Sequence, residues 1–120
     1  MKKVYNIGME ASLEVIGGKW KAVILCHLTT GAKRTGELKR LIPEISQKML
    51  TKQLRELETS GIIDRKVYRQ VPPKVEYNLN DYGKSLTAIL NKLCLWGEHH
   101  IDYLESEGKN IVLLQRHGHK

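Results

Sequence analysis

The segment from Pro43 to Gly61 constrains the fold of this 120-residue chain more than any other stretch. Ser46 is a good helix N-cap, and Gly61 supplies the left-handed residue that ends many helices. Three leucines between them recur at the spacing of one helix face: Leu50, Leu54 and Leu57. Cations and uncharged hydrogen-bonding groups occupy the opposite face and its flank: Gln47, Lys48, Thr51, Lys52, Arg55 and Thr59. The sequence therefore predicts an amphipathic helix over 46–60, with one face that packs and one that carries positive charge.

A cationic helix face of this kind suits a DNA major groove. Lysine and arginine contact phosphates or guanine, and a glutamine amide can read adenine. The alternative interpretation is a solvated helix face with no ligand, so the surrounding elements have to decide between them.

The residues before this helix predict three further helices. Apolar residues at helical spacing indicate helices over 5–16 and 19–28, separated by Gly17-Gly18. Thr35 can cap a short third helix, which Pro43 stops. A short turn then leads into the 46–60 helix, which is the spacing of a helix-turn-helix.

Beyond Gly61 the apolar period changes from that of a helix to that of a strand. A first strand is expected over 63–71, Pro72-Pro73 makes the turn, and residues 74–79 alternate cleanly between two faces. A hairpin with a basic, proline-containing tip directly after a helix-turn-helix describes a winged helix. We therefore expect a mainly α fold with a small β-hairpin wing over 63–79, in one domain covering residues 1–120.

The C-terminal third predicts a long helix over 80–107 that Gly108 ends. A domain this small cannot cover such a helix, so we expect its apolar stripe to pack against a second copy. The tryptophans Trp20 and Trp96 are expected to be packing residues. The expected dimer interface consists of Leu13, Leu86, Ile89, Leu90, Leu93, Trp96, His100, Ile101 and Leu104.

Charge supports a nucleic-acid partner. The net charge is +7, and residues 33–79 hold 11 Lys and Arg against 6 Asp and Glu, so the excess gathers around the predicted helix-turn-helix and wing. No apolar run approaches the roughly 20 residues that span a bilayer, and no signal peptide opens the chain. We expect a cytoplasmic, nucleoid-associated protein with no membrane partner.

The sequence offers no catalytic or metal-binding motif. The G-x-S-x-G motif of serine hydrolases, the Walker loop and the G-x-G-x-x-G motif of dinucleotide-binding proteins are absent. We therefore expect neither an enzyme nor a cofactor. His99 and His100 are adjacent and point about 100° apart on a helix, which does not suit one metal ion. Cys26 and Cys94 lie among apolar residues and are expected to be buried thiols.

Three segments closely resemble the HxlR-type transcriptional regulators, bacterial relatives of the MarR group. They are residues 16–21, 45–57 and 71–77, and the similarity spans roughly 9–96. The resemblance implies a dimeric winged helix-turn-helix on a palindromic double-stranded DNA operator, with the 46–60 helix in the major groove and the wing at the adjacent minor groove. Several members sense oxidants or electrophiles through a cysteine before the first helix. Residues 5–10 here contain none, which argues against a redox or quinone-sensing role of this kind. Whether an oxidant or a small molecule acts as effector is left open.

We therefore interpret the chain as a sequence-specific DNA-binding regulator that acts as a homodimer. The alternative is a winged-helix protein-interaction module, which would not need a basic wing beside a cationic helix. The expected DNA contacts are Lys33, Arg34, Ser46, Gln47, Lys48, Thr51, Lys52, Arg55, Arg65, Arg69 and Lys74.

Overall fold

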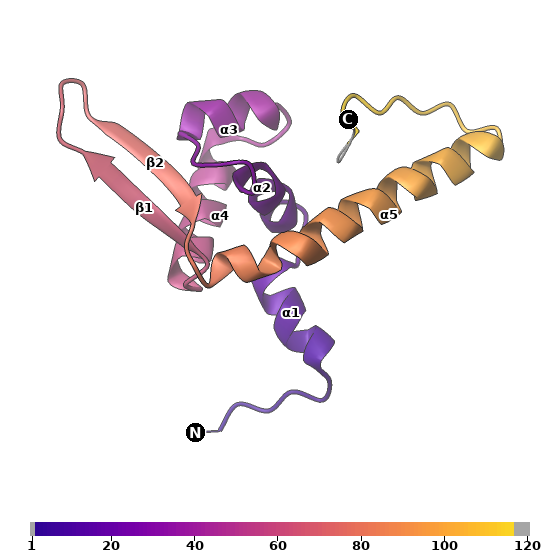
Figure 1. Cartoon of the computed structure of the whole chain (residues 1–120), viewed down its shortest axis with the longest axis horizontal. Coiled ribbons are helices and arrows are strands. Elements are labelled where there is room, and N and C mark those ends of the chain that lie inside the picture. Colours follow the sequence, from indigo (N-terminus) through magenta and orange to yellow (C-terminus); the bar gives the residue numbers. More distant parts are fainter. Residues whose placement is uncertain (1, 117–120) are drawn as a thin grey trace. The chain divides into compact units, whose positions relative to one another are not determined.

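A computed structural model describes residues 2–116 of the chain (Figure 1). The chain divides into two compact units, Met1–Ser85 and Leu86–Lys120. The first unit contains the helices α1 (Gly8–Ile16), α2 (Lys21–Leu28), α3 (Thr35–Leu41) and α4 (Gln47–Thr59), followed by the strands β1 (Ile63–Tyr68) and β2 (Lys74–Leu79). This is the mainly helical fold with a β-hairpin wing that the sequence predicts.

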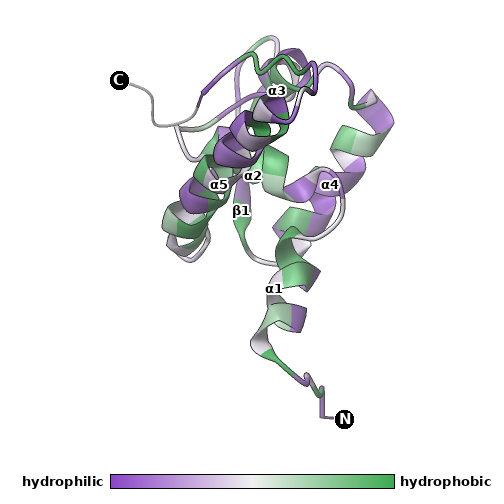
Figure 2. Cartoon of the chain, turned by 90° about the vertical axis from the view of Figure 1, so that its right-hand side faces the viewer, coloured by the Kyte–Doolittle hydropathy of each residue, from purple (hydrophilic) through white to green (hydrophobic). Residues whose placement is uncertain are grey.

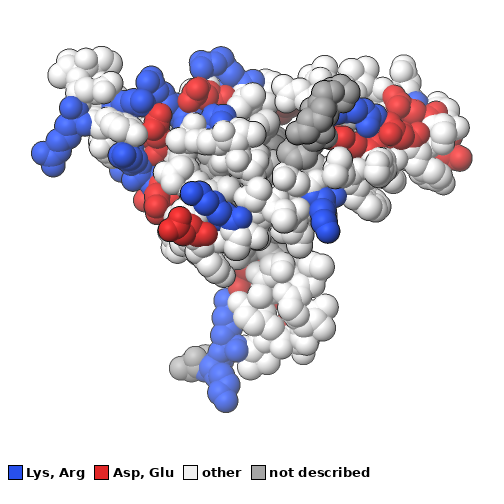
Figure 3. All heavy atoms as spheres, in the orientation of Figure 1, with Lys and Arg blue, Asp and Glu red and all other residues white. Residues whose placement is uncertain are grey.

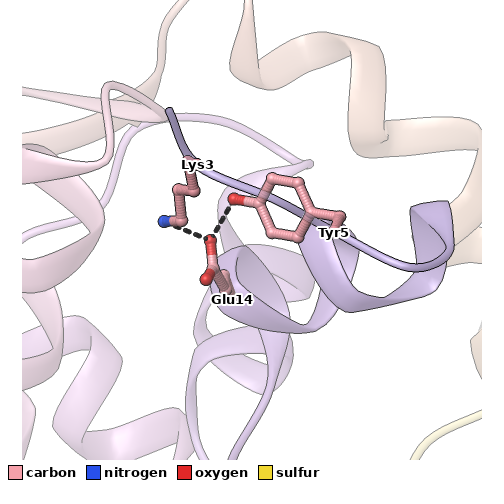
Figure 4. A network of polar contacts seen from close by, with 3 residues as sticks. All are labelled: Lys3, Tyr5 and Glu14. Carbon is pink, nitrogen blue, oxygen red and sulfur yellow. Dashed lines mark hydrogen bonds and ion pairs between the residues drawn. The ribbon is translucent and has the colours of Figure 1, made fainter. Parts of the chain in front are cut away.

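The N-terminal residues form an arm rather than the start of a helix. Helix α1 begins at Gly8, so the expected start at Tyr5 is wrong. Figure 4 shows the reason: the Tyr5 hydroxyl donates to Glu14 Oε1 at 2.5 Å, and Lys3 Nζ lies 3.0 Å from the same oxygen. These contacts hold the arm against α1 and lower the pKa of the Glu14 carboxyl, chiefly through the Tyr5 hydrogen bond.

The core of the first unit lies where α2, α3 and α4 meet the base of the hairpin. Helix α2 contributes from more than one side, as its apolar sequence predicts, and α4 contributes only its leucine face. Because these side chains are removed from water, they supply most of the driving force for folding of this unit. The buried residues are Ile24, Leu25, Leu28, Leu38, Ile42, Ile45, Leu50, Leu54, Leu57, Ile62, Ile63 and Leu79.

Helix α4 begins and ends where its sequence predicts. Ser46 is the N-cap, and its Oγ accepts a hydrogen bond from the Met49 amide at 3.0 Å. Ser60 is the C-cap, and Gly61 follows with φ of +77°, a backbone conformation that residues with a Cβ rarely adopt. Both ends of α4 are therefore fixed by local interactions.

The hairpin is antiparallel, with Ile63 opposite Leu79 and Tyr68 opposite Lys74. The expected extension of the first strand to Val71 is wrong: β1 ends at Tyr68, and Val71 is fully exposed in the loop. Pro72-Pro73 provide no N–H groups for a ladder, so pairing stops before them. On the edge of β2 that does not face β1, the backbone of Lys33 exchanges two 2.9 Å hydrogen bonds with Tyr77, which joins the segment before α3 to β2.

A 3-10 helix, η1 (Gly83–Leu86), separates β2 from the last α-helix. The Oδ1 atom of Asn80 accepts from the Gly83 amide at 2.7 Å, and its Nδ2 donates to the Gly61 carbonyl at 2.8 Å. Asn80 therefore caps η1, and the expected start of the long helix at 80 is wrong. Gly83 packs so closely that a Cβ there would lie 2.1 Å from the Ile62 carbonyl oxygen.

The second unit consists of α5 (Thr87–Ser106) and the segment after it. Gly108 follows the helix with φ of +89°, as expected for a residue that ends a helix. Arg116 forms ion pairs with Asp102 and, at 3.8 Å, with Glu98, so the segment folds back over α5. Figure 2 shows apolar and polar residues interspersed along α5. Within residues 2–116, no helix is both long and apolar enough to cross a membrane.

Candidate nucleic-acid interface

The exposed face of α4 is hollowed, with a volume of roughly 960 Å³. Buried leucines fix the opposite face of the same helix, so the side chains of the hollow are held outward on a rigid element. Six of the eight lining residues are predicted DNA contacts. The lining consists of Ser46, Gln47, Lys48, Met49, Thr51, Lys52, Arg55 and Glu56.

The cations of this face are available for a ligand. Across the described part of the chain, no carboxylate forms an ion pair with Lys48, Lys52 or Arg55, and all three are exposed. Gln47 Nε2 lies 3.5 Å from Thr51 Oγ1, one helical turn along. Gln53, in contrast, is half-buried and its Nε2 lies 3.2 Å from Met49 Sδ, so the two glutamines of α4 have different surroundings.

The hairpin carries a second group of cations, and Figure 3 shows lysine and arginine side chains gathered around it. Arg65 is exposed in β1 opposite Tyr77, and Arg69 is exposed in the loop after β1. Both guanidinium groups are free of ion pairs within residues 2–116. The structure therefore places these two predicted contacts on solvent-facing positions of the wing.

Lys74 is engaged within the hairpin itself. Its Nζ lies 3.3 Å from Glu76 Oε2 and 4.7 Å from the centre of the Tyr68 ring. The Tyr68 hydroxyl donates to Glu76 Oε1 at 3.0 Å, and Lys66 Nζ lies 4.9 Å from the centre of the Tyr68 ring. The Tyr68 hydrogen bond, followed by Lys74, holds the pKa of the Glu76 carboxyl below its usual range.

Lys33 is also held by local partners. Its Nζ donates to Thr30 Oγ1 at 3.0 Å and to the Gly31 carbonyl at 3.2 Å. The neighbouring Arg34 is exposed, and its amide donates to Glu37 Oε1 at 2.8 Å at the start of α3. Of these two predicted contacts, only Arg34 has an exposed side chain, and its positive charge also helps to lower the pKa of Glu76.

A residue pair that sequence reasoning missed lies at the edge of the hollow. Lys21, the first residue of α2, has its Nζ 2.9 Å from Glu56 Oε1 on α4. The pair joins residues 35 positions apart, and although both lie in segments that resemble the HxlR type, nothing in the sequence indicates that their side chains meet. Only the packing of α2 against α4 brings them together.

The predicted interface residues of α5 differ in exposure. Ile89, Leu93, Trp96 and His100 are exposed, Trp96 to 65%. Leu86, Ile101 and Leu104 are half-buried, and Leu90, at 1% exposed, has no surface left for a partner. Tyr103, which the sequence analysis passed over, is exposed and continues a stack in which the rings of Trp96 and His100 lie 5.1 Å apart. In the first unit, Leu13 is exposed on α1.

The cysteine, histidine and acidic side chains were also considered as possible metal or redox sites. Among the described residues, no cluster of three or more His, Cys, Asp or Glu side chains could hold a metal ion. Cys26 and Cys94 are half-buried rather than fully buried. The histidine of α2, His27, has its pKa lowered by burial and by the charge of Lys33.

Comparison with known proteins assigns the chain to a family. Residues 15–105 match the family model described as HxlR-like helix-turn-helix, which covers most of the chain. The chain belongs to this family. An HTH-type transcriptional regulator, YtcD of Bacillus subtilis (strain 168), is 70% identical over 111 residues, which are 92% of this chain and 88% of that protein.

Solved structures agree with the assignment. The crystal structure of YtcD matches with a TM-score of 0.75 at 67% identity, over 80% of this chain and 98% of that one. The redox regulator HypR in its reduced form matches with a TM-score of 0.77 at 52% identity, over 82% of this chain and 97% of that one. The relatives of this HxlR-type chain are thus transcriptional regulators of the helix-turn-helix class, not enzymes.

Proposed function

We propose that this HxlR-type transcriptional regulator binds a palindromic DNA operator as a homodimer, with α4 in the major groove and the hairpin at the adjacent groove. The observation that carries the proposal is the exposed face of α4. Three cations free of ion pairs within residues 2–116 project from a helix whose other face is locked by buried leucines. DNA phosphates are the natural counter-charge for such a face.

The residues of α4 divide into two roles in this proposal. Gln47, Thr51 and Arg55 recur at every fourth position and so form one ridge, which suits contacts with base edges. Lys48 and Lys52 form the neighbouring ridge and contact phosphates, with Ser46 at the helix N-terminus near another phosphate.

The wing and the start of α3 supply further phosphate contacts. Arg65, Arg69 and Arg34 are exposed cations there, and Lys66, also exposed, lies over the Tyr68 ring. Lys33 and Lys74 instead stabilise the loop before α3 and the hairpin, because their ammonium groups already have partners within the chain. We therefore remove these two lysines from the set of direct DNA contacts.

The dimer forms through α5. Its exposed apolar and aromatic residues follow one another at steps of four and three, the spacing of a coiled-coil seam. A seam of this kind on a single helix is stabilised when a second copy covers it. The seam consists of Ile89, Leu93, Trp96, His100 and Tyr103.

An oxidant effector is not part of the proposal. The structural neighbour HypR is a redox regulator whose structure has been solved in oxidised and reduced forms. In this chain no cysteine precedes α2, and Cys26 and Cys94 lie within helices and are half-buried. Neither cysteine belongs to the α4 or hairpin surface through which we propose that DNA is bound.

Selection of genomic DNA fragments by the purified protein tests the function. We expect enrichment of a short inverted repeat, and a gel shift that weakens as salt is raised. The variant Arg55→Ala serves as the control: Arg55 is exposed and outside the buried leucine face, so we expect the variant to keep the fold and to lose the enrichment. Failure of the wild type to enrich any sequence at any salt concentration would favour a protein-interaction module.

A further inference from the structure

The ion pair between Lys21 and Glu56 brings a negative charge to the edge of the proposed DNA interface. The Glu56 side chain is 43% exposed and lines the hollow of α4. Lys21 is only 15% exposed, and its Nζ lies 2.9 Å from Glu56 Oε1. Hydrogen bonding and charge from Lys21, with a further effect of Lys52, lower the pKa of Glu56, so this carboxylate is ionised at neutral pH.

An ionised carboxylate at this position would oppose DNA binding if it stood alone. Phosphates on DNA carry the same charge, and charges within about one Debye length, 8 Å at physiological salt, still interact appreciably. Lys21 has a largely buried stem and donates to the carboxylate, so it is placed to cancel this charge rather than to reach outward to a phosphate.

We propose that Lys21 is a positioning residue of the DNA interface, which holds the Glu56 carboxylate against the flank of α4 and neutralises it so that DNA meets a purely cationic helix face. The proposal rests on the proposed function, because it requires α4 to face DNA. It assigns a role in binding to a residue of α2 that makes no contact with DNA itself.

A double-mutant cycle tests the pair. Affinity is measured for the operator and for an unrelated duplex over a range of salt concentrations, with Lys21→Met, Glu56→Gln and the double variant. We expect Lys21→Met to weaken binding to both DNAs by roughly three- to tenfold, because one uncompensated charge then faces the phosphates. Glu56→Gln should strengthen both, and the double variant should return close to wild type.

Two controls separate this role from others. Lys84→Met removes the same charge from a lysine that pairs with Asp81 at 3.9 Å in the exposed turn after β2, and it should change affinity far less. Thermal unfolding of every variant shows whether the fold persists. A fall in affinity while the unfolding temperature stays near that of wild type is assigned to the bare carboxylate, whereas a fall in affinity that follows a lost fold is not.

The outcomes are distinguishable. If Lys21→Met costs the same affinity with and without Glu56→Gln and lowers the salt slope by about one, Lys21 is itself a phosphate contact and the proposal is wrong. If wild type binds DNA and Lys21→Met binds equally well, the pair has no part in binding. A wild type that binds no DNA overturns the proposed function first, and this inference with it.

Discussion

At the scale of single residues, the two glutamines of α4 offer a matched test of base recognition. Gln47 is exposed on the ridge that we propose faces base edges, whereas Gln53 is half-buried beside Met49. Gln47→Ala should cost on the order of 1–3 kcal/mol at the operator and relax the preference at one base pair, because a bidentate amide contact is lost. Competition binding on single-base operator variants measures this.

Gln53→Ala is the control and should leave the base preference intact. If Gln47→Ala instead weakened binding equally on operator and unrelated DNA, Gln47 would be a backbone contact and not a reader of sequence.

Tyr68 provides a second test at this scale, through pH. Its hydroxyl is the main cause of the lowered pKa of Glu76. Because the folded-state pKa lies below the unfolded value, the contribution to stability is present above the ordinary glutamate pKa of about 4.3 and is lost as pH falls through the folded value. Tyr68→Phe should therefore destabilise the protein at neutral pH, and the difference from wild type should shrink in acid.

Chemical denaturation between pH 3 and 7 measures this difference, with the exposed Tyr82→Phe as the matched control. A difference between wild type and Tyr68→Phe that did not change with pH would assign the effect to ring packing under Lys66 and Lys74 instead.

At the scale of elements, the wing makes a prediction distinct from that of α4. Arg69 is exposed in the hairpin loop and has no ion-pair partner among the described residues. Arg69→Ala should weaken binding to all DNA sequences alike and reduce the salt slope by about one, because a phosphate contact carries no sequence information. Titrations at several salt concentrations measure this.

The neighbouring Gln70→Ala removes no charge and should leave the slope unchanged. A slope that stayed the same in Arg69→Ala would exclude the wing from the phosphate contacts.

The bounds of the helices and strands show which parts of the fold the sequence predicts. Helix α4 and strand β2 were predicted closely because their signals are local: an N-cap at Ser46, a glycine at Gly61, and strict alternation in β2. The predicted starts of α1 and α5 are wrong because contacts between residues apart in the sequence contribute to them: Tyr5 bonds to Glu14 in the N-terminal arm, and Asn80 bonds to Gly61 where it caps η1.

The candidate site shows the same division. The cationic face of α4 follows from helical periodicity, because the spacing of residues in the sequence decides which side of a helix each side chain faces. The local partners of Lys33 and Lys74, and the Lys21–Glu56 pair, could not be predicted, because they depend on contacts between side chains that only the folded loops and helices bring together.

At the scale of the whole molecule, the seam on α5 predicts the oligomeric state. Leu93 is half exposed in the middle of the seam, and Lys92 is its exposed polar neighbour. Leu93→Asp should produce monomers because it buries an unpaired charge in the interface, whereas Lys92→Asp should remain dimeric. Sedimentation analysis measures this, and a dimeric Leu93→Asp would place the interface elsewhere.

The central claim is that two α4 helices enter successive major grooves on one face of the DNA. The most direct test compares affinity for the selected operator with affinity for a version in which five base pairs are inserted between the half-sites. Half-sites about one helical turn apart, near 34 Å, suit a two-fold dimer, and a half-turn insertion moves one of them to the opposite face. We expect affinity for the altered operator to fall to that of a single half-site, and equal affinity for the two operators would contradict the account.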